Sequence, residues 1–200
     1  MGTWVMLLSV PILLIIGHVG ADIPWRRVHI SWYAARAPLG GLVTFAMVLS
    51  TFAILGVARL LPGSLRPRWW ALGLSFVLCI GASGLMTLAL FKVDVDRFTH
   101  NIGLALFFFL STPTMIMIGL TAALNRRPWR ERMAGLLASL TTGTGIAVYV
   151  MWHLIPLEHG VRQRVSFTLI WVAALILLSL VSKRGVSYLK PSGCAAELST

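Results

Sequence analysis

Acidic residues are scarce in this chain of 200 residues, which has six Asp and Glu against 17 Lys and Arg. Charged residues of both signs make up only 12% of it, about half the usual share of a soluble domain. Hydrophobic residues make up 58%, and the mean hydropathy is +0.85. This composition excludes an intrinsically disordered chain, and it is too apolar to cover the surface of a soluble domain. Two cysteines are too few for a disulfide scaffold.

The basic surplus fits two classes of protein. A net charge of +11 often marks a nucleic-acid-binding protein. In a chain this apolar, however, it is typical of a membrane protein whose basic residues lie in loops. The chain lacks a phosphate-binding loop, a dinucleotide fingerprint, a zincin motif and a nucleophile elbow. We therefore expect a membrane protein with no nucleic-acid partner, no cofactor and no bound metal.

Six apolar runs are long enough to cross a membrane. They cover 3–21, 39–61, 69–91, 101–124, 133–155 and 165–182. Each has about 18 to 24 residues, enough at a rise of 1.5 Å per residue to cross a hydrocarbon core of about 30 Å. Unbroken apolarity predicts helices, because the strands of a membrane barrel alternate in polarity and are half as long. The sequence thus predicts an all-α bundle of six transmembrane helices, with one domain over 1–182 and a short disordered cytoplasmic tail over 183–200.

An even number of spans places both termini on one side of the membrane. That side holds ten of the 17 Lys and Arg, and the opposite side holds seven. Basic loops favour the cytoplasm, so both termini are expected there, with the loop from Arg126 to Arg132 as the strongest anchor. Arg greatly outnumbers Lys, as in proteins from GC-rich bacterial genomes. We expect a multi-pass protein of the bacterial cytoplasmic (inner) membrane.

The remaining ionisable residues gather on the opposite, extracytoplasmic side. All five His and four of the six acidic residues fall there, close to the ends of predicted helices. A carboxylate beside an imidazole orients the ring and tunes its pKa toward neutrality, which suits acid–base catalysis. The candidate catalytic residues are Asp96, His100, His153 and Glu158. The candidate substrate-binding residues are Asp22, Phe108, Tyr149 and Trp152.

Several of these candidates also have a purely structural interpretation. Asp96 or Thr99 would serve as the N-cap of the fourth predicted helix. His100 would form only an interfacial hydrogen bond near the same helix end. His153 shares a helix stripe with Tyr149, and it either makes an interhelix hydrogen bond or belongs to a site.

Two local patterns within the spans bear on packing. The small residues of GASG, at 81–84, predict close approach of two helices rather than a ligand cradle. Pro113 predicts a kink in the fourth span. Such a kink is either a packing irregularity or the wall of a substrate cavity between helices.

Three stretches together resemble a known family. They are HISWYAARAP (29–38), VDVDRFTHNIGLALFFFLSTP (93–113) and GVRQRV (160–165). Their order resembles that in the small bacterial membrane proteins of domain of unknown function 998, and more distantly the Frag1/DRAM-like proteins. His100, Ser31, Gln163 and Arg164 match the family's pattern, whereas Trp32 stands where the family usually has an acidic residue. The resemblance implies a six-helix fold and no settled activity.

Two classes of function fit these features. The first is a membrane-embedded enzyme whose His/Asp/Glu cluster performs acid–base catalysis on a lipid-like or isoprenoid substrate. One version is similar to the small membrane-bound terpene cyclases, with Asp96 or Glu158 as the acid and aromatic rings stabilising a cation. Another is a hydrolase that uses Ser31 or a bound metal. The alternative class is a non-enzymatic lipid-binding, transport or accessory subunit. In either class the expected partner is a membrane lipid or an isoprenoid-like small molecule.

Overall fold

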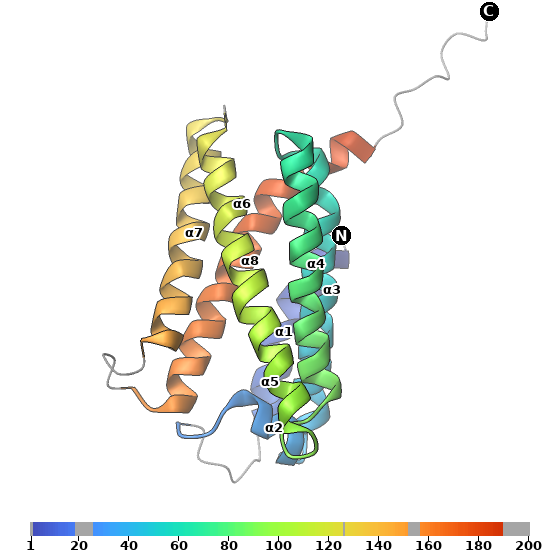
Figure 1. Ribbon diagram of the computed structural model, residues 1–200, viewed down its shortest axis with the longest axis vertical. Coiled ribbons are helices and arrows are strands. Elements are labelled where there is room, and N and C mark those ends of the chain that lie inside the picture. Colours follow the sequence, from blue (N-terminus) through green and yellow to red (C-terminus); the bar gives the residue numbers. More distant parts are fainter. Residues whose placement is uncertain (1, 19–25, 126, 152–156, 190–200) are drawn as a thin grey trace, which may run out of the picture.

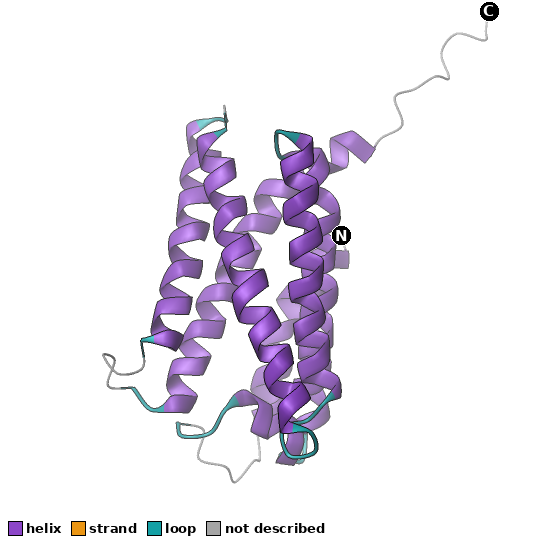
Figure 2. Cartoon of the chain, viewed as in Figure 1, coloured by secondary structure: helices purple, strands orange, loops and turns teal. Residues whose placement is uncertain are grey.

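Helices account for every regular element in the part of the chain that the structure describes. This computed structural model describes residues 2–18, 26–125, 127–151 and 157–189, and Figure 2 shows no strand among them. The elements in chain order are α1 (Gly2–His18), α2 (Ile30–Arg36), α3 (Gly40–Ser64), α4 (Arg68–Leu90), α5 (Arg97–Leu106), the π-helical segment η1 (Phe107–Ser111), α6 (Thr112–Leu124), α7 (Trp129–Val150) and α8 (His159–Leu189). The long helices run side by side as an elongated bundle (Figure 1).

Five segments are long and apolar enough to cross a membrane. The prediction of a bundle of membrane-type helices is confirmed to this extent. The five segments are α3, α4, the continuous stretch Arg97–Leu124, α7, and His159–Ser182 within α8. The first predicted span, 3–21, corresponds to α1, an apolar helix of 17 residues that is shorter than the other five. The last helix continues to Leu189, beyond the predicted end at residue 182.

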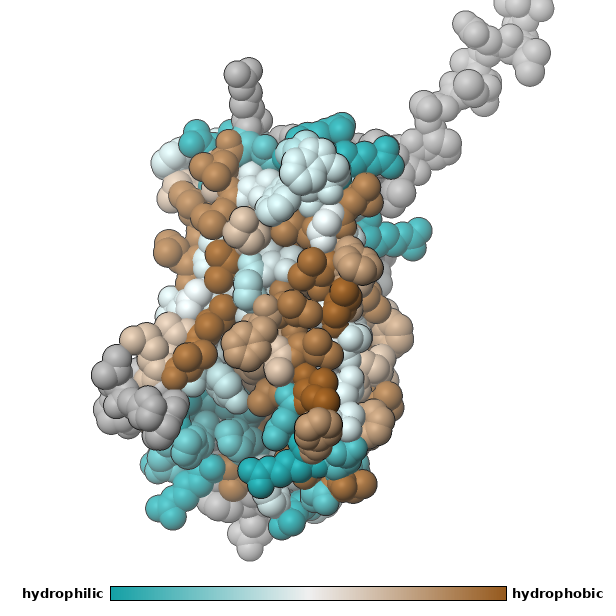
Figure 3. All heavy atoms as spheres, viewed as in Figure 1, coloured by the Kyte–Doolittle hydropathy of each residue, from teal (hydrophilic) through white to brown (hydrophobic). Residues whose placement is uncertain are grey.

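The outer surface of the bundle is apolar between two polar ends. On the face shown in Figure 3 hydrophobic side chains form a belt across the middle of the molecule, with hydrophilic side chains above and below it. Large apolar side chains within this belt are strongly exposed, among them Phe76 at 68%, Phe109 at 75% and Leu140 at 69%. A soluble protein would leave these groups in contact with water, whereas hydrocarbon solvates them without cost.

One end of the bundle is closed by a buried ion pair. Arg127 is 8% exposed, and its Nη1 donates to Glu131 Oε2 at 3.1 Å. Its Nη2 donates to the carbonyl of Ser64, and Ser64 Oγ donates to the carbonyl of Val181 at 2.8 Å. These bonds join the end of α3, the start of α7 and the last turns of α8. The loop that the sequence marks as the strongest basic anchor thus also connects three helices. We call the bonds of Arg127, Glu131, Ser64 and Val181 the Arg127 joint.

The irregularity predicted at Pro113 takes the form of a π-helical segment. The five residues Phe107–Ser111 adopt this wider turn directly before Thr112 and Pro113. Thr114 Oγ1 donates to the carbonyl of Leu110 at 2.6 Å, and Thr112 Oγ1 donates to that of Phe108. Side-chain hydroxyls thereby bond carbonyl groups where the proline, which has no N–H, interrupts the helix. The segment turns Phe107 and Phe108 toward Phe167 of α8.

Glycines at the α4–α5 contact let the two backbones touch. A Cβ placed on Gly84 would lie 2.4 Å from the carbonyl oxygen of Gly103, and one on Gly81 would lie 2.6 Å from the amide of Ser111. Both distances are too short for any real side chain, and the atoms they meet belong to the backbone. The packing role predicted for GASG is confirmed, and this contact fixes where α5 and η1 lie against α4.

We predict that Gly84→Ala destabilises the bundle by about 1–3 kcal/mol, because the added methyl group forces α4 and α5 apart. Gly73→Ala is the matched control, since Gly73 lies on the exposed side of the same helix and nothing comes within 4 Å of its added Cβ. That change should be neutral or stabilising by up to about 1 kcal/mol. Thermal unfolding in detergent measures both effects, and equal midpoints for the two variants would contradict the prediction.

Candidate functional site

A cavity of about 930 Å³ lies inside the end of the bundle opposite the Arg127 joint. Its walls come from α1, α2, α3, α5 and α8, with smaller contributions from α4, η1, α6 and α7. Four of the five His residues are described by the structure, and His18, His29 and His100 line this cavity. The fourth, His159, lies near His29 with the ring centres 6.0 Å apart and the ring planes tilted by 48°. The described His residues therefore gather at one end of the bundle, as the sequence predicted.

The polarity of the cavity changes along its length. Toward the end of the bundle the wall carries Arg97, Arg164, Gln163, Asn101, Ser31 and the three imidazoles. Farther in, the wall is formed by apolar side chains, among them Leu7, Ile54, Met115, Ile170 and Ala174. No Asp or Glu is found among the described residues of the wall. The site thus combines an apolar chamber with a polar end that carries two guanidinium groups.

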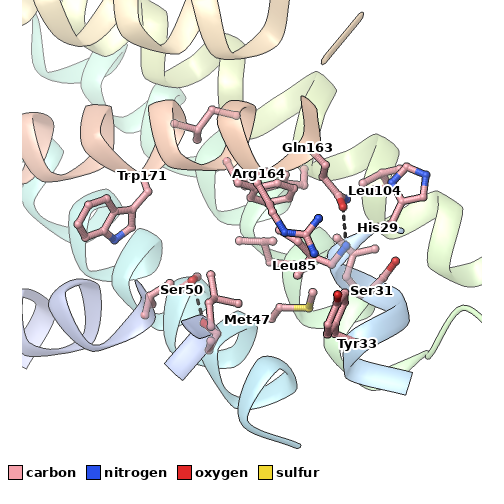
Figure 4. A pocket seen from close by; sticks show the side chains of 18 of the residues that line it. His29, Ser31, Tyr33, Met47, Ser50, Leu85, Leu104, Gln163, Arg164 and Trp171 are labelled. Atoms are coloured by element: carbon pink, nitrogen blue, oxygen red, sulfur yellow. Dashed lines mark hydrogen bonds between the residues drawn. The ribbon is translucent and has the colours of Figure 1, made fainter. Parts of the chain in front are cut away.

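Arg164 lies at the centre of the polar end. It projects from α8 toward Tyr33 of α2, and its guanidinium carbon lies 5.3 Å from the centre of the Tyr33 ring (Figure 4). Its Nη1 donates to the carbonyls of Val28 at 3.0 Å and Gly160 at 2.8 Å. Its Nη2 donates to Nε2 of His18 at 3.0 Å. One side chain thus holds together the ends of α1 and α8 and the segment that leads into α2.

The hydrogen bonds of His18 require its neutral form. Nδ1 faces the carbonyl of Leu14, which can only accept, so Nδ1 carries the ring proton. Nε2 faces the Arg164 guanidinium, which can only donate, so Nε2 must be unprotonated. The ring also packs on Tyr33 with the centroids 3.9 Å apart. His18 is therefore a neutral acceptor that positions Arg164.

The short helix α2 covers the polar end of the cavity and is fastened to α8. The backbone N–H of Ile30, at the start of α2, donates to Gln163 Oε1 at 2.6 Å, as the dashed line in Figure 4 shows. The backbone N–H of Val161 donates to the carbonyl of Arg26 at 3.2 Å. A side chain of α8 thus serves as the cap of α2, for which His29 provides no side-chain cap bond.

His100 is the predicted catalytic residue that does line the cavity. It is 4% exposed, and its Nδ1 donates to the carbonyl of Phe91 at 2.8 Å. Since a carbonyl only accepts, Nδ1 carries a proton, and in the neutral form of the ring the lone pair lies on Nε2. The predicted interfacial hydrogen bond is thus present, and the same bond sets the tautomer that a general base requires.

The predicted aromatic residues form a stacked pair at the side of the cavity. Tyr149 lines the wall, and Phe108 lies behind it with the ring centroids 4.4 Å apart and the planes at 12°. Trp152, His153 and Asp22 lie outside the described residues. Of the predicted substrate-binding residues, Tyr149 alone is described as part of the wall.

Asp96 and Glu158, the predicted acids, do not belong to the described wall of the cavity. Asp96 is the N-cap of α5 and accepts a hydrogen bond from the backbone N–H of Thr99 at 3.0 Å, which confirms the capping interpretation. Hydrogen bonds from the side chain and backbone of Thr99 lower the pKa of Asp96. Glu158 is exposed beside Arg27, with 3.9 Å between Arg27 Nε and Glu158 Oε2. The groups of the described wall that can carry charge near neutral pH are therefore imidazole and guanidinium.

Sequence reasoning missed Arg164, Gln163 and His18 as partners in one site. The sequence places Arg164 and Gln163 just before the last predicted span, 165–182, and singles them out only through the family resemblance. The sequence signal that could have identified Arg164 is its place directly before an apolar run. A basic side chain at the end of a membrane-spanning helix needs hydrogen-bond partners. Among the described residues, no group of three His, Cys, Asp or Glu side chains is placed to hold a metal ion.

Comparison of the chain with protein-family models, with curated proteins and with solved structures gives no match.

We predict that acid loosens the α2 cover through His29. Burial, and next the charge of His159, lower the pKa of His29 from its ordinary value near 6.5. The folded protein then binds fewer protons than the unfolded chain, so stability is complete above about pH 6.5 and is lost as pH falls through the lowered pKa. The unfolding midpoint of the wild type should fall between about pH 7.5 and about pH 5, and the fall should be smaller in His29→Gln. An identical slope in the variant would show that another group is responsible.

Proposed function

We propose that this protein binds a lipid-like or isoprenoid molecule in the cavity between α1, α2, α3, α5 and α8. The observation that supports this proposal is the cavity itself, which is about 930 Å³ in volume and apolar over most of its depth. Its volume lies within the range of pockets that enclose a small organic ligand. Because α3, α5 and α8 belong to membrane-type segments, a ligand in this chamber would come from the membrane, where lipid-like molecules are the abundant apolar solutes.

A second candidate function is enzymatic, and the position of His100 favours it. A buried imidazole whose Nδ1 is held by the Phe91 carbonyl keeps Nε2 as a proton acceptor beside the chamber. Such a group suits general-base catalysis on a bound lipid-like or isoprenoid substrate. The cyclase version, in which Asp96 or Glu158 donates a proton, has less support because neither carboxylate is among the described residues of the wall.

We further propose that α1 is the sixth span, that both termini are cytoplasmic and that the protein resides in a bacterial inner membrane. The basic residues support this orientation, since four Arg at 126, 127, 130 and 132 lie between the end of α6 and the first turn of α7. In this arrangement the cavity opens toward the extracytoplasmic half of the membrane.

We predict that the purified wild type retains a lipid-like molecule and that Ser50→Trp removes it. Ser50 lies on α3 and lines the cavity, so an indole at this position fills part of the chamber. Ala105→Trp is the control, because Ala105 is exposed on α5 and is not part of the wall. Mass spectrometry of the molecules extracted after purification in mild detergent measures retention. A wild type that carries no such molecule, or a Ser50→Trp variant that carries as much as the wild type, would refute ligand binding.

The same measurement separates the two candidate functions. If His100 acts as a base, His100→Gln should keep the cavity occupied but retain a different, unreacted molecule. If the protein only binds its ligand, wild type and His100→Gln should carry the same molecule.

We predict that reporters active only in the cytoplasm work when fused before residue 1 and after Thr200, and fail when inserted beside Asp94. Two cytoplasmic termini require an even number of crossings and hence make α1 a span. An external N-terminus with a cytoplasmic C-terminus would instead leave five crossings.

A further inference from the structure

We propose that a lipid-like ligand enters the cavity sideways, through a seam between α1 and α8, and that the hydrogen bond between Trp171 and Leu7 latches this seam. This inference rests on the proposed function and adds the route by which the ligand reaches its site. The seam consists of the wall residues that lie between two hydrogen bonds joining these helices. They are Val10, Pro11, Leu14 and Ile15 of α1 and Phe167, Thr168 and Ile170 of α8.

The cavity reaches the outer surface of the bundle within the seam. Ile15 of α1 lines the cavity and is nevertheless 66% exposed, and Thr168 of α8 lines it and is exposed as well. A side chain that belongs to both the wall and the surface is all that separates the chamber from the outside at that place. Thr168 lies within the membrane-type segment His159–Ser182, so the seam faces hydrocarbon when this segment spans a membrane.

A second exposed part of the wall is polar. Arg97 and Asn101 also line the cavity and are exposed, and both lie near the start of α5. An apolar chain that entered there would have to leave the hydrocarbon and pass polar groups that prefer water. The seam offers an apolar ligand a path that stays in hydrocarbon, and it is therefore the favoured entrance.

Helix α1 is packed closely on α3 and only loosely on α8. A Cβ placed on Gly17 would lie 2.5 Å from Cγ2 of Val43, and one on Gly56 would lie 2.5 Å from Oγ1 of Thr3. Glycine thus permits close approach of α1 and α3 near both ends of α1. The contacts of α1 with α8 are far fewer than its contacts with α3. Separation of α1 from α8 would therefore disrupt much less packing than separation of α1 from α3.

A hydrogen bond joins α1 and α8 at each end of the seam. At the end near α2, Arg164 Nη2 donates to His18 Nε2 at 3.0 Å. At the inner end, Trp171 Nε1 donates to the carbonyl of Leu7 at 2.8 Å. Figure 4 shows Trp171 and Arg164 projecting from the same side of α8 and well apart along it. The two bonds thus hold the seam closed at two separate levels.

The inner bond depends on a proline in α1. In a regular helix the N–H of residue 11 would donate to the carbonyl of Leu7, but Pro11 has no N–H. The carbonyl of Leu7 is therefore available to Trp171 of the neighbouring helix. Because one hydrogen bond between neutral groups contributes only modestly to stability, such a latch can open and close reversibly.

The latch is tested by the rates of ligand entry and exit. The full chain is purified in mild detergent, and the probes are cis-parinaric acid, a fluorescent polyene fatty acid, and retinol, a fluorescent isoprenoid alcohol. Stopped-flow fluorescence gives the association and dissociation rate constants. Trp171→Phe keeps an aromatic ring but removes the donor, so both rate constants should rise about fivefold while the dissociation constant stays nearly the same.

A matched control is available on another pair of helices. Trp70 Nε1 of α4 donates to Thr121 Oγ1 of α6 at 3.0 Å, and neither residue belongs to the wall. Trp70→Phe therefore also removes one hydrogen bond between helices, and it should leave both rate constants unchanged. If Trp171→Phe fails to fold, Pro11→Ala gives the Leu7 carbonyl a partner within α1, weakens the same latch and should raise both rate constants.

The route is tested by blocking the seam. Thr168→Trp places an indole at the exposed edge of the wall and should lower both rate constants. Val165→Trp is the control, because Val165 is exposed on α8 and is not part of the wall. If Asn101→Trp slows entry and Thr168→Trp does not, the ligand enters from the polar end and the proposed route is wrong.

The remaining outcomes separate this proposal from the proposed function. If neither probe binds the wild type, the proposed function itself is wrong. If the probes bind but Trp171→Phe changes only the dissociation rate constant, Trp171 is a contact of the ligand and does not act as a latch. Unchanged rate constants in both Trp171→Phe and Thr168→Trp would overturn lateral entry while leaving ligand binding intact.

Discussion

The architecture of the candidate site depends on the hydrogen bonds of Arg164. A guanidinium at the start of a membrane-type helix is costly unless acceptors surround it. Here the acceptors come from the carbonyls of Val28 and Gly160 and from His18, which belong to the segment before α2, to α8 and to α1. Satisfying this one side chain therefore brings three segments together around the mouth of the chamber. Gln163, its neighbour in sequence, adds the cap of α2 and completes the cover.

The same bonds decide which protonation states the site contains. His18 lies between a carbonyl and a guanidinium, and this pair of partners is satisfied only by a neutral ring with its proton on Nδ1. His100 has the same tautomer because its Nδ1 faces the Phe91 carbonyl. The site expected from sequence was a set of imidazole–carboxylate pairs. The described wall instead combines imidazoles with guanidinium groups.

Features that depend on neighbouring residues could be predicted, whereas long-range contacts could not. The five long spans follow from uninterrupted apolarity, and the capping role of Asp96 follows from its place three residues before Thr99. The helix α2 has only seven residues and is capped by Gln163, which is 133 positions away in the chain from its partner Ile30. The contact between His18 and Arg164 joins residues 146 positions apart. Periodicity and spacing carry no information on such pairs, so the centre of the site emerged only with the three-dimensional arrangement.

The two ends of the bundle use their arginines in different ways. At one end Arg127 is paired with Glu131 and bonded to Ser64, so its charge is compensated where α3, α7 and α8 close together. At the other end Arg164 donates to the carbonyls of Val28 and Gly160 and to His18 on the wall of the cavity. The Arg127 ion pair stabilises a contact between helices, whereas the Arg164 bonds bring three segments together at the wall of the cavity. The scarcity of acidic residues, the first feature of the sequence, is also seen at this site, since no Asp or Glu is found among the described residues of its wall.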